Sequence, residues 1–229
     1  MSDQDLLERV RVLRSQGSTP KQVARSLGVP PGEAARLVRE VARANAAAAP
    51  EPPVLGCWVS PGWRRGIDAP AEWPDAPVPN GVGSGLVSVL VTRQARWGKV
   101  SVSTCLVDVY CLGVKDAVPP RVMDDAGLAV FRQTLFRLYE VPAVVAPIEM
   151  ARELVWGAVS YARDLGFEPH PDFKLVSDHL GAWEPTGVVR FGCDGKPCYT
   201  QGPFDDAPLV MRTLARSVGE GNFNFLVSA

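Results

Sequence analysis

The sequence has little histidine, no strong excess of either charge and no long apolar stretch. Two of its 229 residues are histidine, and 24 Lys and Arg side chains stand against 25 Asp and Glu. This near balance excludes a chain that binds nucleic acid over its whole surface. A hydrophobic content of 46% excludes a disordered or fibrous chain.

Membrane and secretion signals are also lacking. The longest apolar runs, residues 86–91 and 141–148, are far shorter than the roughly 20 residues that a membrane span needs. The first ten residues carry acids where a secretory signal carries basic residues and an apolar stretch. We therefore expect a cytoplasmic protein without a membrane partner, whose five cysteines are reduced thiols.

Residues 1–44 have apolar side chains at helical spacing, and signals for helix ends divide them into three helices. Gly17 ends the first helix. Thr19, directly before a proline, starts the second, which Gly28 ends. The sequence therefore predicts a three-helix module.

The alanines and prolines of residues 45–53 are typical of a hinge. They separate the module of residues 1–44 from a larger domain over residues 54–229. In that domain the pattern predicts strands at 86–92, 99–110 and 222–227, a hairpin at 187–201, and helices at 127–140, 147–165, 173–180 and 207–218. Because no regular βαβ repeat is present, we expect an α+β fold with a mainly antiparallel sheet.

Residues 54–85 contain many prolines and three tryptophans. Since indole rings stabilise a fold only when they pack, this segment is predicted to be an ordered loop. One hypothesis is that it forms the partner surface of an interaction module in a larger assembly, with an exposed apolar patch.

The second and third helices have a distinctive spacing. Ala24 supplies a small residue where two helices would cross, Gly28 follows four residues later for a tight turn, and Val29 fills the core beneath it. With Ala34 and Leu37 on the inner face of the next helix, residues 19–38 resemble the helix-turn-helix of resolvases, sigma-factor carboxyl domains and small regulators. The larger domain resembles no characterised family.

This resemblance implies nucleic-acid binding, to DNA first and RNA second. Phosphate contacts would come from the side chains Thr19, Lys21, Arg25, Arg36 and Arg39. The positions that read bases in such modules hold Pro30, Pro31, Gly32 and Glu33, none of which is a usual base reader. The alternative is a three-helix clamp for a protein partner.

The charge of the two parts differs in sign. Residues 1–44 carry a net charge of +3 and the remainder carries −4. A single module of this charge neutralises few phosphates, so useful affinity requires a homodimer with two half-sites or help from the larger domain. We expect that domain to dimerise or to sense a ligand.

A second hypothesis makes the larger domain a hydrolytic enzyme. Its candidate catalytic residues are His170, Asp172, Asp205 and Asp206, with His179 nearby. The alternative is structural: Asp205 and Asp206 suit a helix start, and the prolines around His170 suit a rigid turn. No metal-binding spacing such as HExxH is present, and we expect no metal and no cofactor.

Two further features of the larger domain carry alternatives. Cys193 and Cys198 are spaced too widely for a zinc knuckle, and the Asp194-Gly195 pair between them predicts a hairpin turn. Asp108 interrupts an apolar strand, where its carboxylate lies on the solvent face or pairs with Lys115 or an arginine.

The connection between the strands predicted at 86–92 and 99–110 brings cations and an aromatic ring together. These residues are Arg93, Arg96, Trp97 and Lys99. If Trp97 is exposed, the tip can stack on a single-stranded base while the cations hold the backbone. If Trp97 is buried, it is ordinary core.

Overall fold

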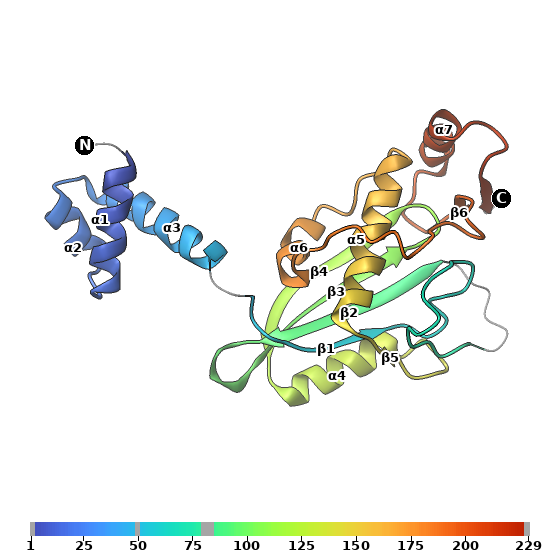
Figure 1. The fold of residues 1–229 in the computed structure, drawn as a ribbon, viewed down its shortest axis with the longest axis horizontal. Coiled ribbons are helices and arrows are strands. Elements are labelled where there is room, and N and C mark those ends of the chain that lie inside the picture. Colours follow the sequence, from blue (N-terminus) through green and yellow to red (C-terminus); the bar gives the residue numbers. More distant parts are fainter. Residues whose placement is uncertain (1–2, 49–50, 79–84, 227–229) are drawn as a thin grey trace. The chain divides into compact units, whose positions relative to one another are not determined.

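A computed structural model describes residues 3–48, 51–78 and 85–226 and divides the chain into two compact units, residues 1–51 and 52–229 (Figure 1). The predicted hinge at 45–53 is partly helical, because its alanines continue the third helix to Ala48. Residues 49–50 of the hinge lie outside the described residues, as do residues 79–84 of the segment 54–85, called the Trp-rich segment below. No helix of the described part has the length and apolarity that would carry it across a membrane.

The first unit, called the N-terminal module below, contains three helices with a core of their own. They are α1 (Asp3–Ser15), α2 (Pro20–Leu27) and α3 (Pro31–Ala48). The apolar positions expected from helical spacing are buried together: Leu6, Val10, Val23, Ala24, Ala34, Leu37 and Val41. The prediction of three helices is confirmed.

The second unit is built on a five-stranded antiparallel sheet of order β4-β3-β2-β1-β5. Its strands are β1 (Val54–Val59), β2 (Leu86–Gln94), β3 (Val100–Asp108), β4 (Gly113–Met123) and β5 (Val144–Val145). This confirms the α+β class with an antiparallel sheet.

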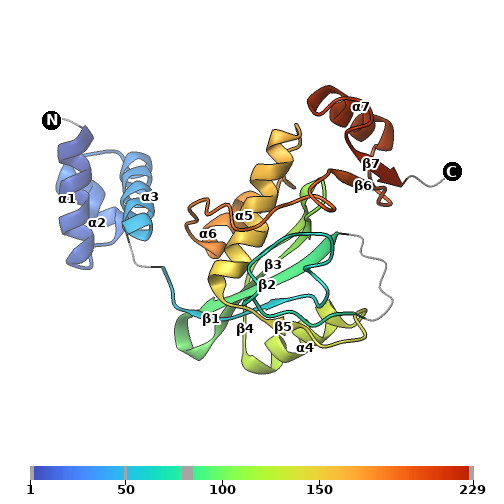
Figure 2. The same ribbon diagram turned by 45° about the vertical axis from the view of Figure 1, so that its right-hand side comes forward.

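Helices cover both faces of this sheet (Figures 1 and 2). Val87, Val89 and Val91 of β2 join one core with α5 (Ile148–Asp164) and α6 (Phe173–Leu180). Leu90, on the opposite face of β2, joins a second core with Phe136 of α4 (Asp125–Phe136). The alternation of side chains along a strand thus supplies two apolar layers from one strand.

Three strands, β1, β4 and β5, lie where no strand was predicted. β1 lies inside the segment predicted as loop. β4 contains Pro119 and Pro120, and these are tolerated because β4 is an edge strand of the sheet. The rest of the Trp-rich segment is an ordered loop as predicted: Trp63 is buried and its Nε1 donates to Pro74 O at 2.9 Å. Among its described large apolar side chains only Leu55 is exposed, so no Trp patch is found there.

The predicted hairpin at 187–201 is wrong, although its turn is correct. Around Asp194 and Gly195 the structure has one isolated bridge, between Cys193 and Lys196. The following strand, β6 (Cys198–Thr200), pairs in parallel with β7 (Asn224–Leu226) instead. Tyr199 of β6 packs with Ala207, Val210 and Leu214 of α7 (Ala207–Ser217) in a small satellite core.

Candidate functional site

The turn between α2 and α3 has the local geometry that the spacing predicts. Thr19 caps α2: its hydroxyl accepts from Gln22 N at 3.3 Å, and Gln22 Oε1 accepts from Thr19 N at 2.7 Å. Gly28 ends α2 with φ 66° and ψ 28°, a left-handed conformation that glycine adopts at low cost. A reciprocal capping box and a left-handed C-cap define both ends of α2.

The four basic residues expected to contact phosphates are all exposed. Lys21 and Arg25 lie one turn apart on α2, and Arg36 and Arg39 lie three residues apart on α3. Each pair therefore shares one face of its helix. Arg36 is partly engaged, because its guanidinium contacts Glu40 Oε2 at 3.1 Å.

The first turn of α3 offers little to a base edge. Pro31 and Gly32 are exposed and Glu33 is half-buried. Neither Pro31 nor Gly32 has a side-chain hydrogen-bond donor. This turn therefore offers no usual base-reading side chain.

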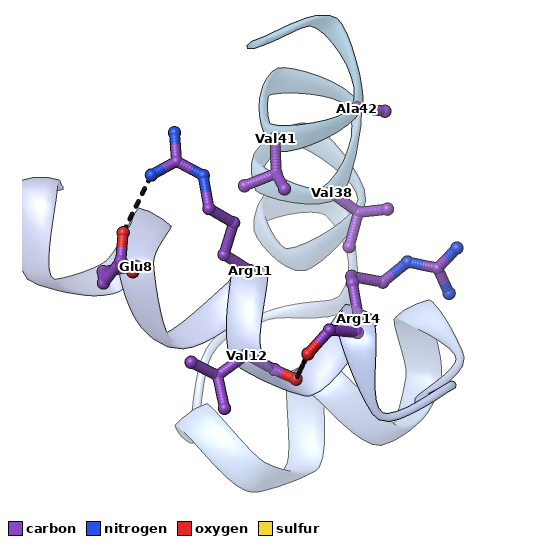
Figure 3. A pocket seen from close by; sticks show the side chains of 8 residues that line it. Glu8, Arg11, Val12, Arg14, Val38, Val41 and Ala42 are labelled. Atoms are coloured by element: carbon purple, nitrogen blue, oxygen red, sulfur yellow. Dashed lines mark hydrogen bonds and ion pairs between the residues drawn. The ribbon is translucent and has the colours of Figure 1, made fainter. Parts of the chain in front are cut away.

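A groove between α1 and α3 was not anticipated from the sequence (Figure 3). It has a volume of about 490 Å³ and is lined by Glu8, Arg11, Val12, Arg14, Ser15, Val38, Val41 and Ala42. Arg11 contacts Glu8 at 2.8 Å, and Val12 is 49% exposed. The available signal was Val12 itself, an apolar residue off the buried stripe of α1.

The candidate catalytic residues of the second unit have different hydrogen-bond partners. His170 Nδ1 accepts from Asp172 N at 3.2 Å within one turn. Asp205 pairs with Lys115 Nζ at 2.7 Å, and Asp206 caps α7 by accepting from Leu209 N at 3.0 Å. Among the described residues no group of three or more His, Cys, Asp or Glu is arranged to hold a metal ion.

His179 lies on α6 and contacts Ser103 of β3. Its Nδ1 is 2.7 Å from Ser103 Oγ, but Ser103 is only 1% exposed, so this pair is enclosed in the fold. Burial, with the nearby Arg93 cation, lowers the pKa of His179 to about 4. The imidazole is therefore neutral at pH 7.

Arg93 is not part of the exposed tip that the sequence suggested. Its side chain is buried and donates to the carbonyls of His179 at 2.6 Å and Leu180 at 3.1 Å. These carbonyls end α6, where a cation also interacts favourably with the helix dipole. Arg93 was expected at the exposed tip, but its side chain points toward α6 and not toward the solvent.

Four of the cysteines are in surroundings that favour the uncharged thiol. Cys57, Cys105 and Cys111 are buried, and burial raises the pKa of the Cys57 thiol to about 11 and that of Cys105 to about 12. Burial likewise raises the pKa of the Cys111 and Cys198 thiols. The uncharged thiol is the unreactive form, so these residues act as small apolar side chains.

Asp108 does not lie on the solvent face, one of the two alternatives from the sequence, and Lys115, named in the other, pairs with Asp205. The carboxylate is 3% exposed, and its Oδ1 accepts from Tyr110 N at 2.9 Å and Cys111 N at 3.0 Å. It thus holds the turn from β3 to β4. Burial raises its pKa from 3.8 to about 6, against the opposing effects of the backbone amides and Lys115.

Comparison of the chain with protein-family models, with curated proteins and with solved structures found no match. Function is therefore inferred from the local geometry and charge of the two units.

Proposed function

We propose that the N-terminal module binds double-stranded DNA through the exposed faces of α2 and α3. The observation that carries this proposal is the combination of the capped α2, its left-handed end at Gly28, and the exposed basic pairs on both helices. Cations so placed neutralise phosphates.

The first turn of α3 limits what such a module can recognise. With proline and glycine exposed there, binding depends on phosphate contacts and on DNA shape. The four cations are few, so two copies of the chain, or a ligand-controlled association of the larger unit, would raise the affinity.

The test is fluorescence anisotropy of a labelled mixed-sequence duplex with the full chain across a salt series. We choose the double variant Arg25→Ala, Arg39→Ala, because removal of Arg36 would also release the Glu40 carboxylate. If each side chain contacts one phosphate, the slope of log affinity against log salt falls in magnitude by about 1.8.

The matched control is Arg212→Ala, Arg216→Ala, which removes the same charge from two exposed positions of α7, one turn apart as Lys21 and Arg25 are on α2. This control should change duplex binding little. Equal affinity of the Arg25/Arg39 variant and the parent, with α-helical circular dichroism retained, would overturn the proposal. Equal losses in both variants would mean diffuse attraction and no defined surface, which overturns it as well.

The groove of Figure 3 favours a second function, docking of a protein partner on α1 and α3. Val12 and Ala42 are exposed apolar side chains beside Arg11, which suits an amphipathic acidic helix. Under this alternative, Val12→Asp abolishes the interaction of the module, whereas the Arg25/Arg39 variant retains it. The duplex assay separates the two, because Val12→Asp leaves the α2 and α3 basic pairs intact.

A further inference from the structure

The connection between β2 and β3 is a tight turn, residues Arg96–Lys99, in which the backbone at Trp97 is not that of a right-handed helix. Lys99 N donates to Arg96 O at 3.3 Å. The two central residues have positive φ, 58° at Trp97 and 67° at Gly98. A four-residue turn with both central residues left-handed is a type I′ turn.

Type I′ turns favour Asn, Asp or Gly at the first central position, because other side chains clash with the backbone there. The chain has a second such turn with the favoured residues: Asp194 and Gly195 have φ 53° and 76°, and Lys196 N donates to Cys193 O at 3.1 Å. At the β2–β3 turn a bulky indole takes the position that Asp194 takes in the other turn. Trp97 therefore carries a backbone cost that turn formation does not require.

The indole of Trp97 receives no packing in return, since the residue is 90% exposed. By contrast, Trp63 is 2% exposed, as expected for a side chain that stabilises a fold through buried area. A strained and solvated tryptophan is explained by contact with something outside the described chain.

The residues around Trp97 indicate the chemistry of that contact. Arg96 and Lys99 flank it and are exposed, and the turn lies at the end of the sheet opposite α7 (Figures 1 and 2). The antiparallel register continues to the pair Gln94 and Val100, so the paired strands end three residues from Trp97 on each side. One exposed ring between two cations matches a base and its flanking phosphates.

We propose that the Arg96–Lys99 turn binds single-stranded nucleic acid, with one base stacked on Trp97 and the adjacent phosphates held by Arg96 and Lys99. A lipid surface is the less favoured partner. Membrane insertion draws on buried apolar area, and the turn itself offers only one large apolar side chain.

The experiment measures binding of the full chain to a labelled oligothymidylate and to an abasic oligonucleotide of the same length. Trp97→Asn should weaken oligothymidylate binding by about 5- to 150-fold, the range for loss of one stacked base. It should leave abasic binding unchanged, because the phosphates remain. Trp97→Phe should retain most of the affinity. Phe204→Asn, which changes another exposed aromatic residue (98%), should have no effect.

The double variant Arg96→Ala, Lys99→Ala tests the phosphate contacts. It should reduce the salt slope for the oligothymidylate by about 1.4. Oligothymidylate affinity of Trp97→Asn equal to the parent, or an equal loss on both oligonucleotides, would overturn the proposal. Trp97-dependent sedimentation with anionic phospholipid vesicles, without oligonucleotide binding, would assign the turn to membranes and would also overturn it.

This inference is independent of the proposed duplex binding. The Arg25/Arg39 variant tests duplex affinity. The Trp97 variants, made in the parent chain, test single-strand affinity. Either result can fail while the other stands.

Discussion

The two ends of strand β3 solve the same problem, reversal of the chain, in opposite ways. At its end, Asp108 is buried and its carboxylate accepts from two backbone amides of the next turn. At its start, Trp97 is exposed and left-handed. Both residues carry a free-energy cost for folding. Burial desolvates the Asp108 carboxylate, and the left-handed conformation strains the backbone at Trp97.

The fold itself offsets only one of these two costs, the desolvation of Asp108. Without the Asp108 carboxylate, the buried amides of Tyr110 and Cys111 would lose their acceptor, so its structural role explains this residue completely. No comparable role explains Trp97, because its ring is solvated. Four predictions, from the largest effect to the smallest, test whether this contrast is real.

The largest effect is expected from Asp108→Ala. Two buried backbone amides lose their acceptor, which should lower the free energy of unfolding by about 4 kcal/mol. Urea denaturation of the full chain measures it. Asp164→Ala, at an exposed position of α5, is the control and should change stability by less than about 0.5 kcal/mol. A similar small change in both variants would remove the structural role of Asp108.

The second effect is a pH dependence. Because the folded pKa of Asp108 is about 6 and its ordinary value is 3.8, the folded state binds the proton more tightly. Its contribution to stability is fully present below pH 3.8 and is lost as pH rises through 6. The free energy of unfolding of the parent relative to Asp108→Asn should therefore fall between about pH 4 and pH 7, by on the order of 3 kcal/mol.

His179 changes stability in the opposite direction over the same range. Its folded pKa, about 4, lies below the ordinary 6.5, so its contribution is present above pH 6.5 and is lost as pH falls through 4. The parent alone can thus show a flat profile. Measurement in the His179→Gln background removes this compensation. If the stability difference between that background and its Asp108→Asn derivative did not change with pH, the prediction would be contradicted.

The sequence predicted what local signals determine. The caps at Thr19 and Gly28 define α2, and the helix at 173–180 was predicted with the bounds that α6 has. β1 was missed because its few residues lie among prolines, and its pairing partner β2 begins only at Leu86. Local patterns carry no information on such distant pairing.

The candidate sites show the same division. Capping roles for Asp206 and the turn role of His170 were recognisable alternatives, since both depend on neighbours in the chain. Burial of Arg93 against α6 joins residues 86 or more apart, so nothing near Arg93 indicated it. The exposure of Trp97 also depends on the tertiary fold, and the sequence left both alternatives open.

The third prediction compares glycines at the two ends of β3. A Cβ on Gly113, which has φ 69°, would lie 2.8 Å from Ala162 Cβ and 3.0 Å from Ala158 O of α5. A Cβ on Gly98, with φ 67°, meets nothing within 4 Å. Gly113→Ala should therefore lower stability by about 2 to 3 kcal/mol, and Gly98→Ala by about 1 kcal/mol from strain alone. Thermal unfolding of both variants would contradict this if the losses were equal.

The smallest expected effect has the opposite sign. Trp97→Asn places the favoured residue in the type I′ turn and removes a ring that is 90% exposed, so no packing is lost. We expect a gain of about 0.5 to 1 kcal/mol in the free energy of unfolding. Asp194→Trp makes the reverse exchange in the matched turn and should cost a similar amount. A loss of stability in Trp97→Asn would mean that the indole packs within the chain, and the contrast between the two ends of β3 would then disappear.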